Sequence, residues 1–141
     1  MGEIKLTYQV DGGDLIQAGE ASSKMKMTLK KLGLPAEVIR RASICMYEGE
    51  INMVIHADGG RVEVDVGMDA ITLRLIDHGP GIPDVNQAME EGFTTAGDVA
   101  RDLGFGAGMG LPNMKRYSDE MTIETEVGKG TVVTVVIKIP Q

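Results

Sequence analysis

The chain has 141 residues, enough for one compact domain and too few for two ordinary ones. A hydrophobic share of 43% and a charged share of 25% exclude wholesale disorder, and the net charge of −7 argues against a broad basic surface for nucleic acid. With a single cysteine, no apolar run of membrane-spanning length and no signal-peptide pattern, we expect a cytoplasmic protein without a disulfide that contacts neither membrane nor nucleic acid directly.

The first half of the chain alternates between strand and helix patterns. Residues 4–10 alternate apolar and polar side chains, as a half-buried strand does. Helices are predicted over about 14–32 and, after a proline start, over about 35–57. Two alternating segments, 61–66 and 71–76, then predict a hairpin.

The second half contains a glycine-rich stretch between two further groups of elements. This stretch, residues 79–110, includes a short helical pattern around 84–91. A further helix is predicted from just after Gly110 to about Asp119, and strands at 121–127 and 131–139 close the chain. The order of elements predicts an α/β (α+β) two-layer sandwich, with a mixed, largely antiparallel sheet and helices on one face. We expect the whole of residues 1–141 to be a single domain.

Four glycines at every second position, Gly104, Gly106, Gly108 and Gly110, precede the predicted helix. Such spacing permits close approach of a ligand to backbone N–H groups, and the helix N-terminus beyond adds further donors, a combination that suits phosphate. The spacing of a Rossmann or Walker A loop is absent. The other interpretation is a flexible surface loop without a ligand.

A carboxylate, Asp77, ends an apolar strand and is followed by Gly79 and Gly81. A carboxylate that loses water needs hydrogen-bond donors, and a ligand amine, such as that of a nucleobase, is one candidate. The alternative is an aspartate that caps its own turn.

Within the second predicted helix, Glu48 and Asn52 are four residues apart and share a face, whereas Glu50 points elsewhere. A carboxylate flanked by apolar neighbours suits proton abstraction, and an amide oxygen suits a largely hydrated Mg²⁺. The alternative is an ordinary polar helix face.

In this order the motifs resemble the GHKL-type (Bergerat) ATP-binding fold shared by histidine kinases, gyrase, Hsp90 and MutL, over about residues 35–139. They are Glu48-x-x-x-Asn52, Asp77-x-Gly79-x-Gly81, Gly106-x-Gly108-x-Gly110 and Gly130-Thr131. Within that superfamily the chain resembles the bacterial anti-sigma-factor serine kinases, RsbW-like and especially the RsbT-like switch kinases. The residues that carry this closer resemblance are 77–82, 91–95 and 108–116.

The resemblance implies a role for each motif. Glu48 would be the general base, and Asn52 would bind ATP through Mg²⁺. Asp77 would accept from the adenine amine, Gly79 and Gly81 would shape the adenine pocket, and Thr131 would support Asp77 or a bound water. Residues from about 92 to 107 would form a lid over ATP. The backbone donors to the phosphates would come from Gly106, Gly108 and Gly110.

The function that the resemblance implies is an ATP- and Mg²⁺-dependent serine/threonine kinase of a bacterial partner-switching system. Its substrate would be a STAS-domain antagonist of an anti-sigma factor. A sigma factor, a PP2C-type phosphatase regulator and a second copy of the chain are further candidate partners. The alternatives are a nucleotide-gated module that sequesters a partner with little kinase activity, and a fragment of an ATPase or chaperone.

Overall fold

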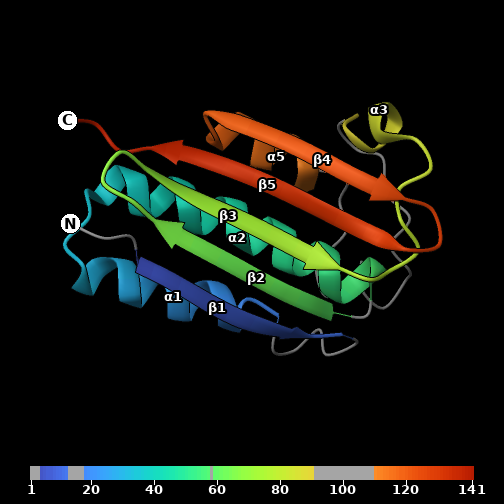
Figure 1. The fold of residues 1–141 in the computed structure, drawn as a ribbon, viewed down its shortest axis with the longest axis horizontal. Coiled ribbons are helices and arrows are strands. Elements are labelled where there is room, and N and C mark those ends of the chain that lie inside the picture. Colours follow the sequence, from blue (N-terminus) through green and yellow to red (C-terminus); the bar gives the residue numbers. More distant parts are fainter. Residues whose placement is uncertain (1–3, 13–17, 58, 91–109) are drawn as a thin grey trace.

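A five-stranded sheet and a layer of helices make up the protein in a computed structural model that describes residues 4–12, 18–57, 59–90 and 110–141 (Figure 1). The strands lie in the order β1-β2-β3-β5-β4, and all four neighbouring pairs are antiparallel. The expected two-layer α+β sandwich is therefore confirmed. The strands are β1 Ile4–Asp11, β2 Gly59–Val66, β3 Ala70–Asp77, β4 Glu120–Glu126 and β5 Gly130–Lys138.

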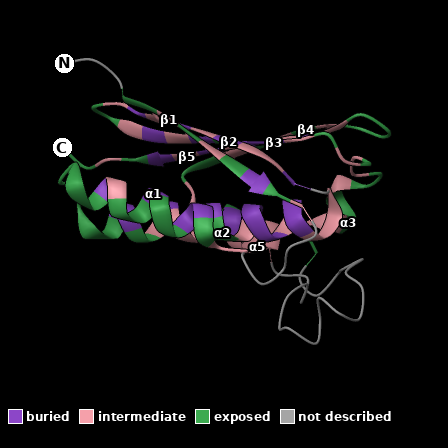
Figure 2. Ribbon diagram, turned by 90° about the horizontal axis from the view of Figure 1, so that it is seen from below, coloured by how far each residue is buried: buried purple, intermediate pink, exposed green. Residues whose placement is uncertain are grey.

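Helices α1, α2 and α5 pack on one face of the sheet, and no described helix covers the other face (Figure 2). The short helix α3 lies at the end of the molecule where α2, β3 and β4 also end (Figure 1). No helix in the described ranges is long and apolar enough to cross a membrane. The helices are α1 Glu20–Lys31, α2 Ala36–His56, α3 Val85–Ala88 and α5 Gly110–Tyr117.

The core lies between the helices and the inner face of the sheet. On β3, the side chains of Ile71, Leu73 and Leu75 are 0 to 2% exposed, while the intervening Thr72 and Arg74 are more accessible. Side chains alternate between the two faces of a strand, so every second residue reaches the helical layer. Burial of each large aliphatic side chain contributes about 1.5–3 kcal/mol. The central strands therefore hold α2, which carries two of the motif residues, firmly against the sheet.

Helix α1 begins at Glu20, whereas the periodicity predicts a helix from about residue 14; of that difference, residues 14–17 lie outside the described residues. Gly19, immediately before it, has a left-handed backbone with φ of 100°, which ends the right-handed helix on that side. The carboxylate of Glu50 on α2 accepts hydrogen bonds from the backbone N–H groups of Gly19 and Ser22, both at 3.0 Å. The start of α1 is thus set by a contact with another helix, which local periodicity cannot reveal. The other elements agree with their predicted bounds to within a few residues.

Candidate active site

A polar stripe on α2 faces α5. Its members, Arg41, Cys45, Glu48 and Asn52, follow one another at spacings of four, three and four residues, which places them on one side of the helix. The pair Glu48 and Asn52, predicted to share a face, forms the C-terminal half of this stripe. The N-terminal half was not singled out from the sequence, because an arginine and a cysteine at helical spacing carry no ligand signature.

The N-terminal half of the stripe holds the end of α5. Nε of Arg41 donates to the carbonyl oxygen of Tyr117 at 2.9 Å, and Sγ of Cys45 donates to that of Met114 at 3.5 Å. Burial raises the pKa of the Cys45 thiol to about 12, so this thiol is a structural donor and not a nucleophile. Both contacts use carbonyls in the last turns of α5 and set its position against α2.

Glu48 and Asn52 meet the first turn of α5. Nδ2 of Asn113 donates to Oε2 of the half-buried Glu48 at 2.6 Å. Gly110 lies beside Asn52, where a Cβ atom on the glycine would be 3.0 Å from Nδ2 of that side chain. Asn52 follows Glu48 on α2, whereas its neighbour Gly110 precedes Asn113 on α5. The two helices therefore run antiparallel. In the described part of the chain, Oε1 of Glu48 accepts from no group and is available to a substrate hydroxyl.

Glu50 is on the opposite side of α2 from Glu48, as their spacing predicts. It is 3% exposed, and its two oxygens accept from the backbone N–H groups of Gly19, Ala21 and Ser22 at 3.0 to 3.1 Å and from the Ser22 hydroxyl at 2.6 Å. This carboxylate satisfies donors at the start of α1, which have no partner inside that helix. Of the two acidic residues, only Glu48 faces the stripe that contains Asn52.

Asn52 is the side chain that the sequence assigns to Mg²⁺. It is half-buried, and no described residue makes a hydrogen bond to its amide group. Within the described ranges, no three acidic, histidine or cysteine side chains gather into a protein cage for a metal. Mg²⁺ keeps several waters and uses few protein ligands when phosphates also hold it. A single uncommitted amide oxygen beside the start of α5 fits that kind of ion.

Asp77, the predicted adenine contact, is the last residue of β3. Its Oδ1 accepts from the backbone N–H of Gly79 at 2.9 Å, so the carboxylate does cap its own turn, as the alternative interpretation required. Its Oδ2 accepts from no group among the described residues. Capping therefore occupies one oxygen and leaves the second for a ligand donor.

Asp77 belongs to a row of three polar side chains that crosses three strands. Its direct partner on β5 is Thr131, and the partner of Thr131 on β4 is Thr125. The hydroxyls of Thr131 and Thr125 are 2.9 Å apart, and that of Thr125 also accepts from the N–H of Ile82 at 2.8 Å and donates to the carbonyl of Gly130 at 3.2 Å. Thr125 was missed from the sequence, although a hairpin around residues 128–130 pairs it with Thr131.

The two glycines after Asp77 allow close packing where β3 leaves the sheet. A Cβ on Gly79 would lie 2.6 Å from that of Ala57 at the end of α2. Gly81 has φ of +79°, a conformation that favours glycine, and a Cβ there would lie 2.5 Å from the carbonyl oxygen of Glu126. The loop after β3 thus packs against both the end of α2 and the hairpin that carries Thr125. The row of polar side chains on the sheet therefore lies near the C-terminal end of the polar stripe on α2.

The matches to known proteins agree with this geometry. A family model described as histidine kinase-, DNA gyrase B- and HSP90-like ATPase matches residues 39–141, which include both the stripe on α2 and the row across the sheet. The chain belongs to this ATPase family. The family matched is thus the one that the motifs predicted, and its nucleotide is ATP.

Two individual relatives show to which branch of the ATPase family the chain belongs. The chain is 33% identical over 106 residues to the serine/threonine-protein kinase RsbT of Bacillus subtilis, with 72% of this chain and 74% of that protein covered. It is 34% identical over 103 residues to an anti-sigma F factor of Clostridium beijerinckii, with 69% and 68% covered. The chain is therefore a member of the anti-sigma-factor serine/threonine kinase branch of the ATPase family, as the closer resemblance predicted.

Part of the predicted phosphate-binding glycine run lies outside the described residues. Gly106, Gly108 and the predicted lid at 92–107 fall in the range 91–109, of which the structure says nothing. Gly110 is described, and it is the first residue of α5. The helix N-terminus expected after the glycine run is therefore present, beside Asn52.

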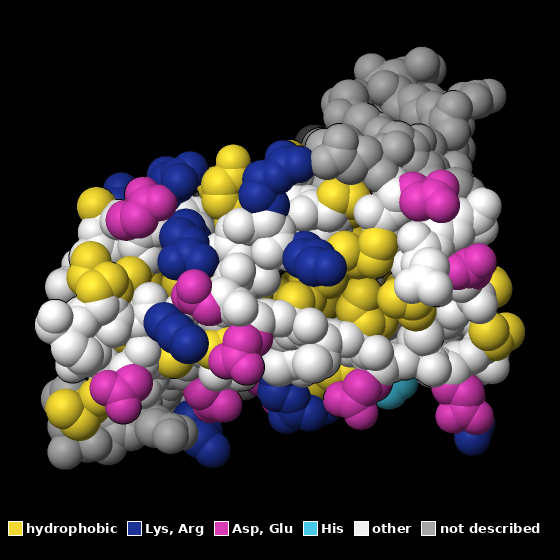
Figure 3. All heavy atoms as spheres, turned by 90° about the horizontal axis from the view of Figure 1, so that it is seen from above, with side chains coloured by type: hydrophobic (Ala, Val, Ile, Leu, Met, Phe, Trp, Pro, Cys, Tyr) yellow, Lys and Arg dark blue, Asp and Glu magenta, His cyan; other side chains and the backbone are white. Residues whose placement is uncertain are grey.

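Basic side chains are concentrated on the side of the kinase that carries α5. Lys115 and Arg116 are exposed in its last turn, and Arg40 is exposed near the start of α2. Figure 3 shows lysine and arginine side chains gathered over the helical layer on this side, next to an apolar patch. One of these basic groups, Arg40, is already ion-paired with Glu37 at 2.8 Å, so the positive charge of this surface is partly neutralised within the protein.

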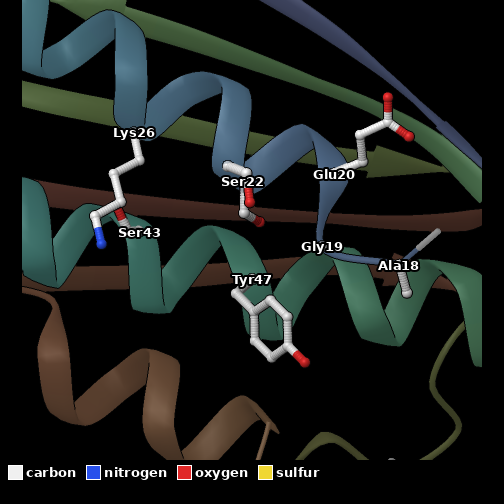
Figure 4. Close-up of a pocket in the computed structure, with 8 residues that line it drawn as sticks. Ala18, Gly19, Glu20, Ser22, Lys26, Ser43 and Tyr47 are labelled. Atoms are coloured by element: carbon white, nitrogen blue, oxygen red, sulfur yellow. The ribbon is translucent and has the colours of Figure 1, made fainter. Parts of the chain in front are cut away.

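A groove of about 580 Å³ lies between α1 and α2. Gly19 and Lys26 border it on the α1 side, and Ser43 and Tyr47 on the α2 side (Figure 4). None of the motif residues lines it, because Tyr47 faces α1 whereas Glu48, the next residue, faces α5. The groove is therefore distinct from the candidate active site.

Proposed function

We propose that this protein transfers the γ-phosphoryl group of ATP to a serine or threonine hydroxyl of a STAS-domain antagonist in a bacterial partner-switching system. One observation carries the proposal. The polar stripe of α2 meets α5 at Glu48 and Asn52, while the row of Asp77, Thr131 and Thr125 lies at the same end of the sheet. This arrangement supports a site in which separate parts of the chain would supply a base, a ligand for a metal-bound phosphate and an acceptor for the adenine amine.

At the adenine end of the site, contacts within the protein orient the side chains that would bind the base. Oδ2 of Asp77 would accept from the exocyclic amine of adenine, while the bond from Gly79 keeps Oδ1 and the carboxylate plane in place. Thr131, buried at 7% exposure, is fixed by Thr125 and supports this edge of the pocket. A guanine base presents a carbonyl oxygen in place of that amine, so the carboxylate would reject it.

The phosphate end of the site is formed by the first turn of α5 and by Asn52. Backbone donors there, together with those of Gly106 and Gly108, would hold the phosphates. Asn52 would bind Mg²⁺, which when present neutralises charge on the phosphate oxygens. The unpaired amide of Asn52 supports this assignment because it has no competing partner in the described part of the chain.

The reaction requires one proton acceptor. The hydroxyl oxygen of the substrate serine or threonine forms a bond to the γ-phosphorus. The bond from that phosphorus to the β–γ bridging oxygen breaks, and ADP leaves. The hydroxyl proton passes to Oε1 of Glu48, the oxygen that Asn113 does not engage. In-line positioning of the two reactants supplies most of the acceleration in phosphoryl transfer, and a base adds about 10²–10⁴-fold.

The branch of the family supports the proposed partners. One relative is named a serine/threonine-protein kinase and others are named anti-sigma F factors. This supports a STAS-domain antagonist as substrate, with a sigma factor or a PP2C-type phosphatase regulator as a second partner and a homodimer as a further assembly. A cytoplasmic location and a single domain over residues 1–141 remain predictions that accompany this role.

The proposal is tested by incubating the protein with Mg²⁺, γ-³²P-ATP and purified STAS-domain proteins from the same cell, alongside Glu48→Gln. Label in one STAS protein, absent with the variant and absent when the acceptor serine or threonine is alanine, supports the kinase. If ATP binds and a stable complex forms but no STAS protein is labelled, the sequestering module replaces it. ATP hydrolysis without any protein acceptor would instead favour an ATPase.

A further inference from the structure

We propose that Asn113 of α5 is a positioning residue that orients Glu48 for proton transfer. This inference rests on the proposed function, since it assigns a role to the neighbour of the proposed base. Asn113 lies 65 residues from Glu48 in the chain, and its amide nitrogen is 2.6 Å from Oε2 of that carboxylate. The contact is a charge-assisted hydrogen bond, about twice as strong as a neutral one.

The orientation of the Asn113 amide is set by a second contact. Nη1 of Arg116, one turn further along α5, donates to Oδ1 of Asn113 at 3.4 Å. An amide has a donor end and an acceptor end, so an arginine at the oxygen directs the NH₂ group to the carboxylate. Asn113 therefore presents a donor, and not an acceptor, to Glu48.

The backbone that carries Asn113 is held firmly. The next residue, Met114, is 0% exposed, and its carbonyl accepts from Cys45 on the α2 stripe. At the end of the helix, Arg41 donates to the carbonyl of Tyr117 and forms an ion pair of 3.3 Å with Asp119. These contacts leave α5 little freedom to move along α2, so the bond between Asn113 and Glu48 fixes one carboxylate oxygen in space.

Fixing Oε2 determines the direction of the other oxygen. A carboxylate is planar, so with Oε2 held by Asn113 the free Oε1 has a restricted set of positions from which to accept the hydroxyl proton. Gly110, one turn before Asn113 on the same face of α5, lies against Asn52. The same helix therefore orients the proposed base and borders the proposed Mg²⁺ ligand, which sets the distance between the reacting proton and the phosphate.

The experiment compares Asn113→Asp and Asn113→Leu with the unmodified protein in steady-state phosphorylation of the STAS substrate and in ATP binding. Both variants keep the approximate shape of asparagine, but Asp places a second carboxylate against Glu48 and Leu offers no donor. We expect kcat to fall by about 10²-fold in each, with the dissociation constant for ATP unchanged, because misplacement of a catalytic group acts on the chemical step. Asn113→Gln, which keeps the donor on a longer side chain, should recover part of kcat.

The control for the added charge is Gln9→Glu, an amide-to-carboxylate change at an exposed site on β1, the edge strand farthest from β4. Its kcat should equal that of the unmodified protein. Thermal unfolding of all variants shows whether they fold. If Asn113→Leu does not fold, Asn113→Asp and Asn113→Gln still decide the question.

A double-mutant cycle separates this inference from the proposed function. If Asn113 acts through Glu48, adding Asn113→Asp to Glu48→Gln should lower the residual kcat no further. An inactive Glu48→Gln together with a fully active Asn113→Asp would overturn only the positioning role. A Glu48→Gln variant with full kcat would overturn the base assignment itself, and the positioning role with it.

Discussion

Glu48 and Glu50 lie two residues apart on α2, and their carboxylates engage different helices. Oε2 of Glu48 accepts from Asn113 on α5, whereas Glu50 accepts from three backbone N–H groups and a hydroxyl around the start of α1. Residues two apart on a helix point in directions about 200° apart, so one carboxylate faces the site and the other faces the interior. The same chemical group therefore has a catalytic assignment at one position and a structural role at the other.

Conversion of each to glutamine should separate these roles. Glu48→Gln should lower phosphoryl transfer by about 10²–10⁴-fold with little change in stability. Glu50→Gln should lower the free energy of unfolding by about 1–3 kcal/mol, because a buried charge-assisted network loses acceptor strength, while kcat stays near that of the unmodified protein. Kinetics and urea unfolding of both variants check the prediction. The reverse pattern would exchange the two assignments.

Asp77→Asn distinguishes a turn cap from an adenine contact. The asparagine oxygen can still accept from the N–H of Gly79, so the turn should persist and stability should change little. Its NH₂ group would replace the acceptor that faces the adenine amine, so the preference for ATP over GTP should disappear. Competition binding with the two nucleotides measures this. Unchanged preference would restrict Asp77 to its capping role.

Thr125→Val should weaken both the fold and ATP binding. The substitution removes a hydroxyl that accepts from Ile82 N–H and contacts the Thr131 hydroxyl. Groups left without a partner cost about 1–3 kcal/mol of unfolding free energy. Thr122→Val, on an exposed position of the same strand, is the matched control and should have little effect on either quantity. Equal effects of the two substitutions would exclude a special role for Thr125.

Gly110→Ala should reduce Mg²⁺-dependent ATP binding by about tenfold, or ~1.4 kcal/mol. The added methyl group would lie 3.0 Å from Nδ2 and 3.1 Å from Oδ1 of Asn52 and would displace that side chain. Gly67→Ala serves as the control, since its methyl group would be 3.5 Å from the nearest atom, the carbonyl oxygen of Ala70. Titration calorimetry with and without Mg²⁺ measures both. If ATP affinity falls equally in the two variants, the effect does not arise from Asn52.

Asp119 should contribute stability that depends on pH. The backbone N–H of Lys138 donates to this carboxylate at 2.7 Å and, together with Arg41, lowers the pKa of Asp119 below its ordinary value. Because the pKa of Asp119 is lower in the folded protein than in the unfolded chain, its ionised form stabilises the fold at pH values above the unfolded pKa of about 3.9. This stability is lost as the pH falls through the lower pKa of the folded state. The exposed position limits the contribution to about 1 kcal/mol.

Asp119→Asn should therefore be less stable than the unmodified protein at pH 7, and this difference should be smaller at pH 3. Urea unfolding at the two pH values measures the difference. A difference that is independent of pH would show that the ionised form has no special role.

Much of the fold was readable from the sequence because it depends on local patterns. Alternation of side chains along β3 and β5 identifies strands, and the spacing of Glu48 and Asn52 places them on one face of a helix, whatever surrounds it. The order of the motifs then predicted the ATPase family. Their individual roles at the site remain predictions, since spacing alone does not show what each side chain contacts.

Only the tertiary structure could reveal the contacts between distant segments. Asn113 and Glu48 are 65 residues apart, and Thr125 reaches the N–H of Ile82 across 43 residues. The start of α1 likewise depends on Glu50, which is 28 residues from Ser22. Periodicity determines which face of an element is apolar, but a polar side chain acquires its partner only when packing brings another element to it. In this protein the sequence determined the elements and their faces, and the packing of α5 and β4 decided which polar groups meet.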